Sequence, residues 1–430
     1  MHKPVHSLLF VFTLWCALAV LPHRGFAFDG LPDAKPEDVG LSSERLKRID
    51  KWIENYASSG KLAGLSVAII RHGKVAYVGK AGLADIENNV RVQDDTIFRI
   101  FSMTKPITAV ALMILVEEGK VHISDPVETY LPEFKNVMVY AGRDKNGKVI
   151  LEKPRRAMTI RDLLSHTSGL SYGLTNEPID QIYKESGVFN LHQTLSEFTA
   201  KLATLPLVSH PGDAWRYAFG LEVMGRIIEV VSGMPFDAFM QTRILDPLGM
   251  KHTYFYLPPE ERGRLAQVYF PGKNGEGLQI GKPPKGREQD YTRENVKLVS
   301  GGAGLVATMG DYLRFTQMLL NGGELNGVRI LGPKTVELMM LDHVRPSIGP
   351  KPGGISGYGF GLGGAVLRNV ATSQYPGSVG EYTWAGSAST VFWVDRKEDL
   401  GVVLMAQLNP SDTYPLRKEL KILVYQALTK

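Results

Sequence analysis

The chain has 430 residues, of which 44% are hydrophobic and 22% are charged, a composition typical of globular proteins and not of disordered or fibrous ones. Its 49 Lys and Arg against 44 Asp and Glu give a net charge of +5, and this small excess, without a long basic run, excludes nucleic acid as the expected partner. The one cysteine, Cys16, excludes an internal disulfide framework and a thiolate-rich metal site, and the length favours two subdomains.

The first 27 residues have the three-part layout of a secretory signal. Basic side chains precede an uncharged stretch over residues 7–21, which is shorter than the roughly 20 residues that a spanning helix needs. Pro22 breaks that stretch, and Gly25 and Ala27 supply the small residues of a cleavage site. We therefore expect cleavage after Ala27 and export to the periplasm or the medium, with no stable membrane insertion of the mature chain. An uncleaved anchor is the alternative.

Two helices and two strands are expected in the first part of the mature chain. The helices show apolar residues at helical spacing with glycine stop signals, and the strands are short apolar runs on either side of a tight turn. The expected elements are a helix over 43–57, strands over 65–70 and 75–78, and a long helix over 102–118.

The middle of the chain is predicted to be mainly helical. An Asn146-Gly147 turn predicts one hairpin, between strands over 137–140 and 149–151. The expected helices cover residues 160–164, 195–202, 221–231 and 236–244. Residues 271–297 are rich in Gly, Pro and Lys, and we expect a solvated surface loop there, with a functional lid as the alternative.

The last part of the chain returns to strands, over 390–394 and 401–406, before a final helix over 416–428. Strands at both ends and helices between them predict one sheet built from both ends of the chain, with a mainly helical domain inserted. We place the sheet domain at 28–125 and 295–430 and the inserted helical domain at 126–294.

The segment Ser102-Met103-Thr104-Lys105 places a serine at the start of a predicted helix and a lysine three residues later on the same face. A serine hydroxyl is a weak nucleophile until a neighbouring group takes its proton. A lysine takes it only when burial or positive charge lowers its pKa well below the ordinary value. The helix start adds positive potential and free amides that can meet an oxyanion. The pattern predicts Ser102 as a nucleophile and Lys105 as its partner.

Two other serines fit catalytic patterns in weaker contexts. Ser58 begins a second S-x-x-K that ends at Lys61, but the predicted stop at Gly60 falls between the two. Ser171 lies in a G-x-S-x-G run over residues 169–173, a motif that needs a strand before the serine and a helix after it. The sequence predicts neither, so both serines are interpreted as structural.

The seven histidines beyond residue 27 form no close ligand pair. We therefore predict neither a metal nor an organic cofactor. His166 precedes a Thr-Ser-Gly turn and is interpreted as a structural histidine, with a role as a base as the alternative.

Further segments follow the serine–lysine motif in a recognisable order. They are Leu163–Leu170, Pro211–Tyr217 with Gly225–Gly233, Pro247–Met250 and Gly301–Leu305. Together with Ser102-x-x-Lys105 they resemble the serine β-lactamase and D-alanyl-D-alanine-peptidase superfamily, in its class C-like branch. The resemblance covers nearly the whole mature chain. It implies the α+β, β-lactamase/D,D-peptidase-like fold, an antiparallel sheet flanked by helices with an inserted mainly helical domain.

The resemblance also implies the roles of individual residues. Ser102 would be the nucleophile, Lys105 a base partner and Tyr217 the second catalytic group, since a tyrosine near cations can accept a proton and return it to the leaving group. The backbone amides of Ser102 and Ser387 would form the oxyanion hole. Which of Lys105 and Tyr217 is the base in acylation stays open.

Two departures from the family pattern bear on the substrate. The second motif, Tyr-x-Asn in β-lactamases of this branch, is Tyr217-Ala218-Phe219, and the third, usually Lys-Thr-Gly, is Trp384-Ala385-Gly386. Trp384, Gly386 and Phe219 are thus the expected substrate contacts. The Trp-x-Gly variant is similar to that of family VIII carboxylesterases.

The lost lysine decides between substrates. A charge-assisted hydrogen bond contributes about 1.5–3 kcal/mol, so its loss disfavours anionic lactams and peptides by about tenfold to a hundredfold. We expect a serine carboxylesterase that acts on small-molecule, short-chain esters through an acyl-enzyme, and weak β-lactam hydrolysis is compatible with the same chemistry. The alternatives are a class C-like β-lactamase, a peptidoglycan D,D-peptidase, an amidase or transacylase, and a non-catalytic module that binds cell-wall peptides. The sequence does not specify the oligomeric state.

Overall fold

The computed structural model describes residue 28 and residues 30–272, 277–281, 296–345, 348 and 356–429. The predicted signal and most of the predicted loop over 271–297 therefore lie outside the described residues. Among the helices of the described part, none combines the length and the apolar character needed to cross a bilayer.

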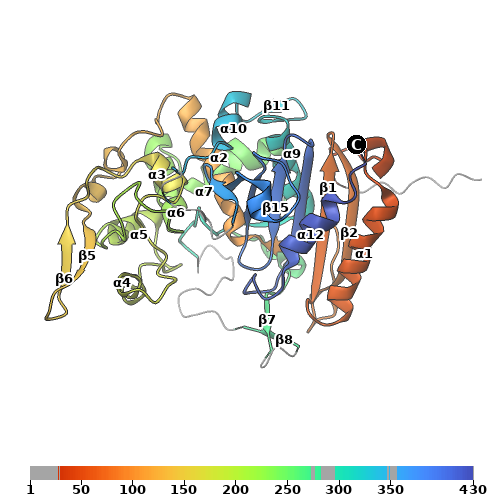
Figure 1. The fold of residues 1–430 in the computed structure, drawn as a ribbon, viewed down its shortest axis with the longest axis horizontal. Coiled ribbons are helices and arrows are strands. Elements are labelled where there is room, and N and C mark those ends of the chain that lie inside the picture. Colours follow the sequence, from red (N-terminus) through yellow and green to blue (C-terminus); the bar gives the residue numbers. More distant parts are fainter. Residues whose placement is uncertain are drawn as a thin grey trace, which may run out of the picture.

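An eight-stranded antiparallel sheet forms the centre of the structure, and strands from both ends of the chain build it (Figure 1). The strand order is β12-β13-β14-β15-β16-β1-β2-β3, so that the last strand of the chain pairs with the first. The strands are β1 (Gly64–Arg71), β2 (Lys74–Asp85), β3 (Val90–Arg91), β12 (Tyr358–Phe360), β13 (Ala365–Leu367), β14 (Tyr382–Ala385), β15 (Val391–Asp395) and β16 (Leu400–Ala406). The predicted α+β fold with a large antiparallel sheet is confirmed. The domain boundaries given above remain a prediction.

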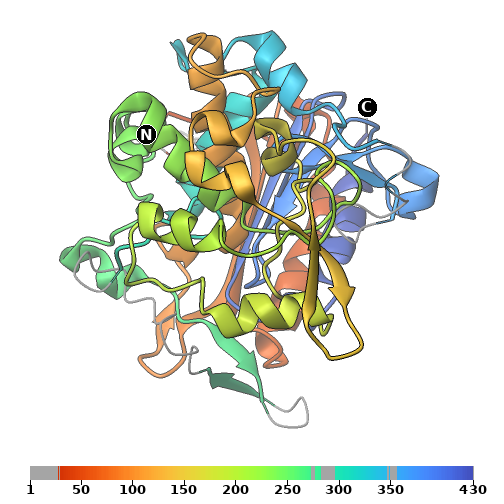
Figure 2. The same cartoon turned by 90° about the vertical axis from the view of Figure 1, so that its left-hand side faces the viewer.

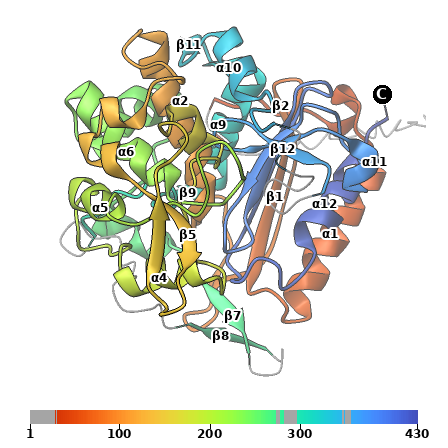
Figure 3. The same ribbon diagram turned by 60° about the vertical axis from the view of Figure 1, so that its left-hand side comes forward.

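The sheet is covered by helices on both faces. Every residue of β1 and β16 is buried, because alternate side chains of a strand point to opposite faces and both faces are packed. Helices α1 (Ser43–Ser58) and α12 (Leu416–Tyr425) cover one face, and α9 (Met309–Leu320) covers the other (Figure 3).

The central helix α2 (Thr104–Glu117) is buried on all sides over residues 104–115. A helix that is apolar all round belongs in the interior of a protein, and α2 packs there against α6 (Gly220–Ser232). A short 3₁₀ turn, Phe101–Met103, precedes it. The prediction of one continuous helix from Ser102 is therefore corrected: Ser102 lies in the 3₁₀ turn and Lys105 in the first turn of α2.

The middle of the chain forms a helical region beside the sheet, drawn in yellow to green in Figure 2. Its helices are α3 (Ile160–Leu164), α4 (Pro178–Ser186), α5 (Leu195–Leu202), α6, α7 (Phe236–Met240) and α8 (Asp246–Leu248). The predicted hairpin is present as β5 (Val139–Arg143) and β6 (Val149–Glu152). The helix predicted over 236–244 is present, but its second half is a π-helical turn, Gln241–Leu245, through which α7 continues into α8.

Several elements were not predicted from the sequence. Four of them are helices: α4, α9, α10 (Pro333–Met339) and α11 (Val370–Ser373). Strands β3, β12, β13 and β14 were not predicted either, nor were the short pairs β4 (Ile97–Arg99) with β9 (Val306–Thr308), β7 (Tyr269–Pro271) with β8 (Leu278–Ile280), and β10 (Glu324–Leu325) with β11 (Val328–Arg329). Strands of two to four residues carry too little periodicity to detect. The pair β4–β9 matters most here, since it brings the segment before Ser102 beside the segment after the glycines at 301–304.

Candidate active site

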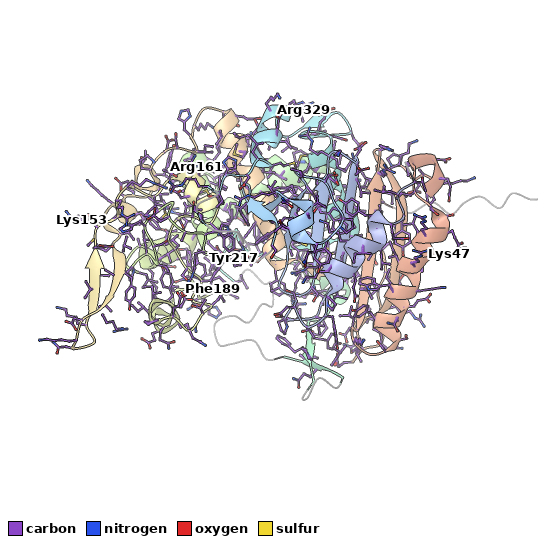
Figure 4. The ribbon with its side chains drawn as sticks, in the orientation of Figure 1. Lys47, Lys153, Arg161, Phe189, Tyr217 and Arg329 are labelled. Atoms are coloured by element: carbon purple, nitrogen blue, oxygen red, sulfur yellow. The ribbon has the colours of Figure 1, made fainter. Side chains whose placement is uncertain are left out.

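Three predicted residues meet at one oxygen atom. Lys105 Nζ donates to Ser102 Oγ at 3.2 Å, and the Tyr217 hydroxyl donates to the same Oγ at 2.6 Å. Tyr217 comes from 115 positions farther along the chain. Figure 4 shows it where the helical region meets the sheet. The structure thus brings together a hydroxyl, an ammonium group and a phenol within direct hydrogen-bonding reach.

The backbone around Ser102 explains how serine and lysine share a face. Ser102 lies in the 3₁₀ turn and Lys105 in the first turn of α2, and helical side chains three positions apart lie on the same face. The turn begins at Phe101, whose φ of 44° is a left-handed conformation that costs a non-glycine residue free energy. This backbone conformation directs Ser102 to the start of α2, where free amides and the helix dipole provide positive potential.

Lys105 is fully buried, and a buried ammonium group needs acceptors in place of water. Its Nζ donates to the carbonyl oxygen of Gly302 at 2.8 Å and lies 4.6 Å from the ring centre of Tyr217 and 5.3 Å from that of Tyr172. Gly302 has no space for a side chain, because a Cβ there would lie 2.2 Å from Glu222 Oε1. The glycine-rich segment after residue 300 can therefore approach Lys105 closely.

A second polar group, missed by the sequence analysis, lies behind Lys105. Both Tyr172 and Ser300 donate hydroxyl hydrogen bonds to the fully buried carboxyl group of Glu222. Burial raises the pKa of Glu222, and the positive charge of Lys105 acts in the opposite direction. Burial also raises the pKa of Tyr172 well above its ordinary value. No local motif marks Glu222; only its position beside Lys105 in the fold shows its relation to the site.

His166 lies under the site and not in it. It is fully buried, and its ring packs 4.8 Å from that of Tyr217. The Ala218 amide donates to its Nδ1 at 3.3 Å, so the neutral ring carries its proton on Nε2. Burial, with a smaller contribution from the charge of Lys105, lowers its pKa well below the ordinary value. The arrangement fits the structural interpretation.

The rival serines stand apart from this group. Ser171 is buried and donates to Asp180 at 2.6 Å, and Ser58 is the last residue of α1. Within the described residues, no three side chains of His, Cys, Asp or Glu gather as a metal site would require. Of the candidate nucleophiles, only Ser102 has both a lysine and a tyrosine against its hydroxyl.

A cavity of about 620 Å³ opens beside Ser102. Four residues that the sequence predicts at the site line it: Tyr217, Trp384, Gly386 and Ser387. Their roles toward a substrate stay predictions. A Cβ at Gly386 would lie 2.4 Å from the Ile100 carbonyl oxygen, so this glycine is needed for β14 to approach the turn that holds Ser102. In the described residues, β13 pairs with β14 only at Tyr382 and Thr383. The backbone of residues 384–386 therefore has no partner strand on that side, and this edge is open to a substrate.

Trp384 forms an aromatic wall of the cavity. It is 9% exposed, and its ring lies 5.5 Å from Tyr217 and 5.0 Å from Phe360. A cation from another part of the chain is nevertheless close. Arg417 of α12, which also lines the cavity, donates to the carbonyl oxygens of Gly386 and Thr390. The sequence analysis missed Arg417 because it lies 33 positions after Trp384 in a helix without a motif.

Burial lowers the pKa of Arg417 to about 10, while negative charge on Asp412 or Tyr217 acts to raise it. The guanidinium therefore stays protonated at neutral pH. Its charge interacts with Tyr217, and Lys105 Nζ lies over the ring of the same tyrosine. Two cations thus act on Tyr217.

The prediction for Phe219 is corrected. Phe219 precedes α6, is only 2% exposed, and packs its ring 4.3 Å from Tyr172 and 5.3 Å from Phe198. It is not among the residues that line the cavity. The chain turns at Phe219 to begin α6, and the Phe219 side chain points into the core. Phe219 therefore packs against Tyr172 and does not line the cavity beside Ser102.

Known proteins resemble this chain over most of its length. The family model described as Beta-lactamase matches residues 49–426. Protein Rv1367c of Mycobacterium tuberculosis is 35% identical over 377 residues, which cover 83% of this chain and 89% of that protein. Esterase EstB of Burkholderia gladioli is 31% identical over 376 residues, with the same coverage. The solved structure of EstCE1, described as a hydrolase with promiscuous acyltransferase activity, superposes with a TM-score of 0.73 at 26% identity, covering 90% of this chain and 98% of that one.

Proposed function

Because the chain belongs to the beta-lactamase family, we propose that it is a serine carboxylesterase that hydrolyses short-chain esters through an acyl-enzyme. The observation that carries the proposal is the Ser102 hydroxyl, held between Lys105 and Tyr217 at a cavity whose wall at the third motif is the neutral ring of Trp384. The names of the relatives EstB, an esterase, and EstCE1, a hydrolase, point the same way.

In the first step, Ser102 Oγ bonds to the ester carbonyl carbon and its proton passes to Lys105 or Tyr217. Both groups donate to Oγ in the structure, and the loss of one proton from either turns that group into an acceptor. The carbonyl oxygen becomes an oxyanion between the amides of Ser102 and Ser387. The carbon–oxygen bond to the alcohol then breaks, and the alcohol leaves with the proton.

In the second step, water adds to the acyl-serine carbon and gives a proton to the same pair. The bond to Oγ breaks, the carboxylic acid leaves, and Ser102 regains its proton. Arg417 fixes the carbonyl oxygens on both sides of Ser387, which keeps the second oxyanion donor in place.

The preference for neutral esters follows from the third motif. Trp384 supplies no charge at the position of the third motif, and Arg417 already donates to two backbone carbonyl groups. Of the other cations that line the cavity, Lys421 is paired with Glu381 and Lys418 lies over the ring of Tyr375. Anionic lactams and peptides therefore lose about tenfold to a hundredfold relative to a site with a lysine there. Weak β-lactam turnover fits the shared acyl-enzyme chemistry. The predicted leader also leads us to propose export of the protein.

The test compares p-nitrophenyl butyrate with nitrocefin on the purified wild type and on Ser102→Ala. We expect preferential turnover of the butyrate ester and its loss in Ser102→Ala. Ser58→Ala, the serine of the second S-x-x-K, is the matched control and should keep full turnover. A large preference for nitrocefin would show that the protein is a β-lactamase and not an esterase. Ester turnover that survives in Ser102→Ala would refute the mechanism. Faster release of p-nitrophenol when alcohols or amines are added would indicate a transacylase.

A further inference from the structure

The cavity beside Ser102 continues beneath helix α12. Thr383 lies opposite Trp393 across β14 and β15, while Trp384 lies opposite Phe392, so the first pair faces α12 and the second faces away from it. Thr383 and Trp393 both line the cavity. The space of about 620 Å³ exceeds what a short acyl chain fills.

Three polar side chains line the cavity beneath α12. Tyr358, Glu381 and Lys421 are 5%, 1% and 8% exposed, and each contributes to the cavity wall. Lys421 Nζ donates to the Tyr358 hydroxyl at 2.6 Å and to Glu381 Oε1, and the Tyr358 hydroxyl donates to Glu381 Oε1 at 3.1 Å. An ammonium group has three protons, so Lys421 has one more than these two acceptors use.

The network is held from behind. The Tyr425 hydroxyl lies 2.8 Å from Glu381 Oε2 and 2.7 Å from Asp395 Oδ2, and the rings of Tyr358 and Trp393 lie 5.4 and 5.9 Å from Lys421 Nζ. Lys421 therefore has little freedom to turn away from the cavity. Burial raises the pKa of Glu381, and the charge of Lys421 opposes that effect.

The charges of this group favour a neutral partner. Lys421 pairs with Glu381, and Tyr425 connects Glu381 to the buried Asp395, so this network carries no net positive charge. Two more cations line the cavity: Arg417 donates to the carbonyl oxygens of Gly386 and Thr390, and Lys418 lies over the ring of Tyr375. A substrate hydroxyl group can accept a hydrogen bond from Lys421 and can also donate one to an oxygen of the network. A hydrocarbon can do neither, and an ionised carboxylate can accept but cannot donate. Aromatic rings of Trp393 and Tyr375 on the same cavity wall can cover the apolar faces of a ring or chain that carries the hydroxyl.

We propose that Tyr358, Glu381 and Lys421 form a subsite for a neutral hydroxylated part of the substrate, a polyol or a sugar, joined through the ester to the part held at Ser102. The subsite rests on the proposed esterase function and gives its substrate class. Its residues determine specificity and do not touch the reacting atoms.

The test uses esters that differ only at the far end. In the first series the alcohol part varies: hexyl butyrate is compared with its ω-hydroxyl and ω-carboxylate analogues and with a butyrate ester of glucose. In the second series the acyl part varies: methyl octanoate is compared with its ω-hydroxyl analogue. We expect kcat/KM to be about tenfold higher for a hydroxylated member, mainly through KM, because one buried hydrogen bond is gained. Equal values in both series, or a preference for the alkyl or the carboxylate member, would overturn the subsite.

Two variants connect the preference to these residues. Lys421→Met removes the donor and should abolish the hydroxyl preference while p-nitrophenyl butyrate turnover remains, whereas Lys334→Met, at an exposed lysine on α10, should keep the preference. If Lys421→Met does not fold because Glu381 loses its partner, the double variant Lys421→Met with Glu381→Gln, which leaves no unpaired buried charge, decides in its place. Hydroxyl preference that survives the loss of Lys421 would refute the assignment. Failure of the wild type to hydrolyse any ester would refute the proposed function and the subsite together, whereas ester turnover without hydroxyl preference would refute the subsite only.

Discussion

The guanidinium group of Arg417 donates to the carbonyl oxygen of Gly386 at 2.5 Å, so the last helix of the chain holds the turn that follows β14. The same group donates to Thr390 at 3.2 Å, at the other end of that turn. Ser387, whose amide is the predicted second oxyanion donor, lies between the two anchored residues. A residue that touches no reacting atom in the proposed mechanism is thereby connected to the geometry of the reaction.

Replacing Arg417 should lower kcat with little change in KM. In Arg417→Met the turn loses both anchors, and a displaced oxyanion donor costs about tenfold to a thousandfold in kcat. Arg417→Lys should recover part of the loss, since an ammonium group can reach one of the two carbonyl oxygens but not both in a fork. Steady-state kinetics with p-nitrophenyl butyrate measure both constants. A rise in KM at unchanged kcat would show that Arg417 binds substrate and does not position the turn.

Removing the phenol oxygen of Tyr217 should reduce kcat by about a hundredfold to ten-thousandfold, the range expected for a positioned proton-transfer group. In Tyr217→Phe the ring and its contacts with Trp384 and Lys105 remain, so the melting temperature should stay close to that of the wild type. Single-turnover kinetics show whether acylation or deacylation slows. A loss smaller than tenfold would leave Lys105 as the one essential proton acceptor.

A methyl group at Gly302 should damage both stability and activity. In Gly302→Ala the new Cβ would lie 2.2 Å from Glu222 Oε1, next to the carbonyl oxygen that accepts from Lys105. We expect a loss of about 1–3 kcal/mol in the free energy of unfolding, typical of overpacking, together with reduced kcat. Gly263→Ala is the matched control, because a Cβ there meets no atom within 4 Å. Equal stability of the two variants in urea unfolding would show that the glycine-rich segment adapts without cost.

Stability should fall as the pH is lowered below about 6.5, the ordinary pKa of histidine. The pKa of buried His166 is lowered in the folded state, so between that value and 6.5 the unfolded chain binds a proton that the native protein does not. Under these conditions the free energy of unfolding decreases with decreasing pH. Urea unfolding at pH 7.5 and 5.5 should show a smaller decrease for His166→Asn than for the wild type. Identical decreases would mean that other groups control the acid sensitivity.

The exported protein should begin at Phe28. Cleavage after Ala27 removes Cys16, so the mature protein should not react with thiol reagents. Mass spectrometry of the protein from the periplasm or the medium measures the cleavage site directly. An intact chain that stays with the membrane fraction would favour the uncleaved anchor.

Local patterns in the sequence were enough for the elements that carry their own signals. The hairpin at Asn146-Gly147, helix α5 and the strands β15 and β16 were predicted within a few residues, since turn chemistry and apolar periodicity act over short distances. The same is true of Ser102 and Lys105, which lie three positions apart, although the sequence did not distinguish the 3₁₀ turn at Ser102 from the α-helix that follows.

The sequence by itself determined the α+β class, the serine–lysine pair and, through the resemblance of ordered motifs, the place of Tyr217. Only the tertiary structure decided that Glu222 lies behind Lys105, that Arg417 holds Gly386, that Lys421 meets Glu381 under α12, and that Phe219 is buried. The physical reason is that periodicity tells which face of an element is apolar but not which distant element packs against it. Contacts between residues tens or hundreds of positions apart are fixed by the packing of the whole chain.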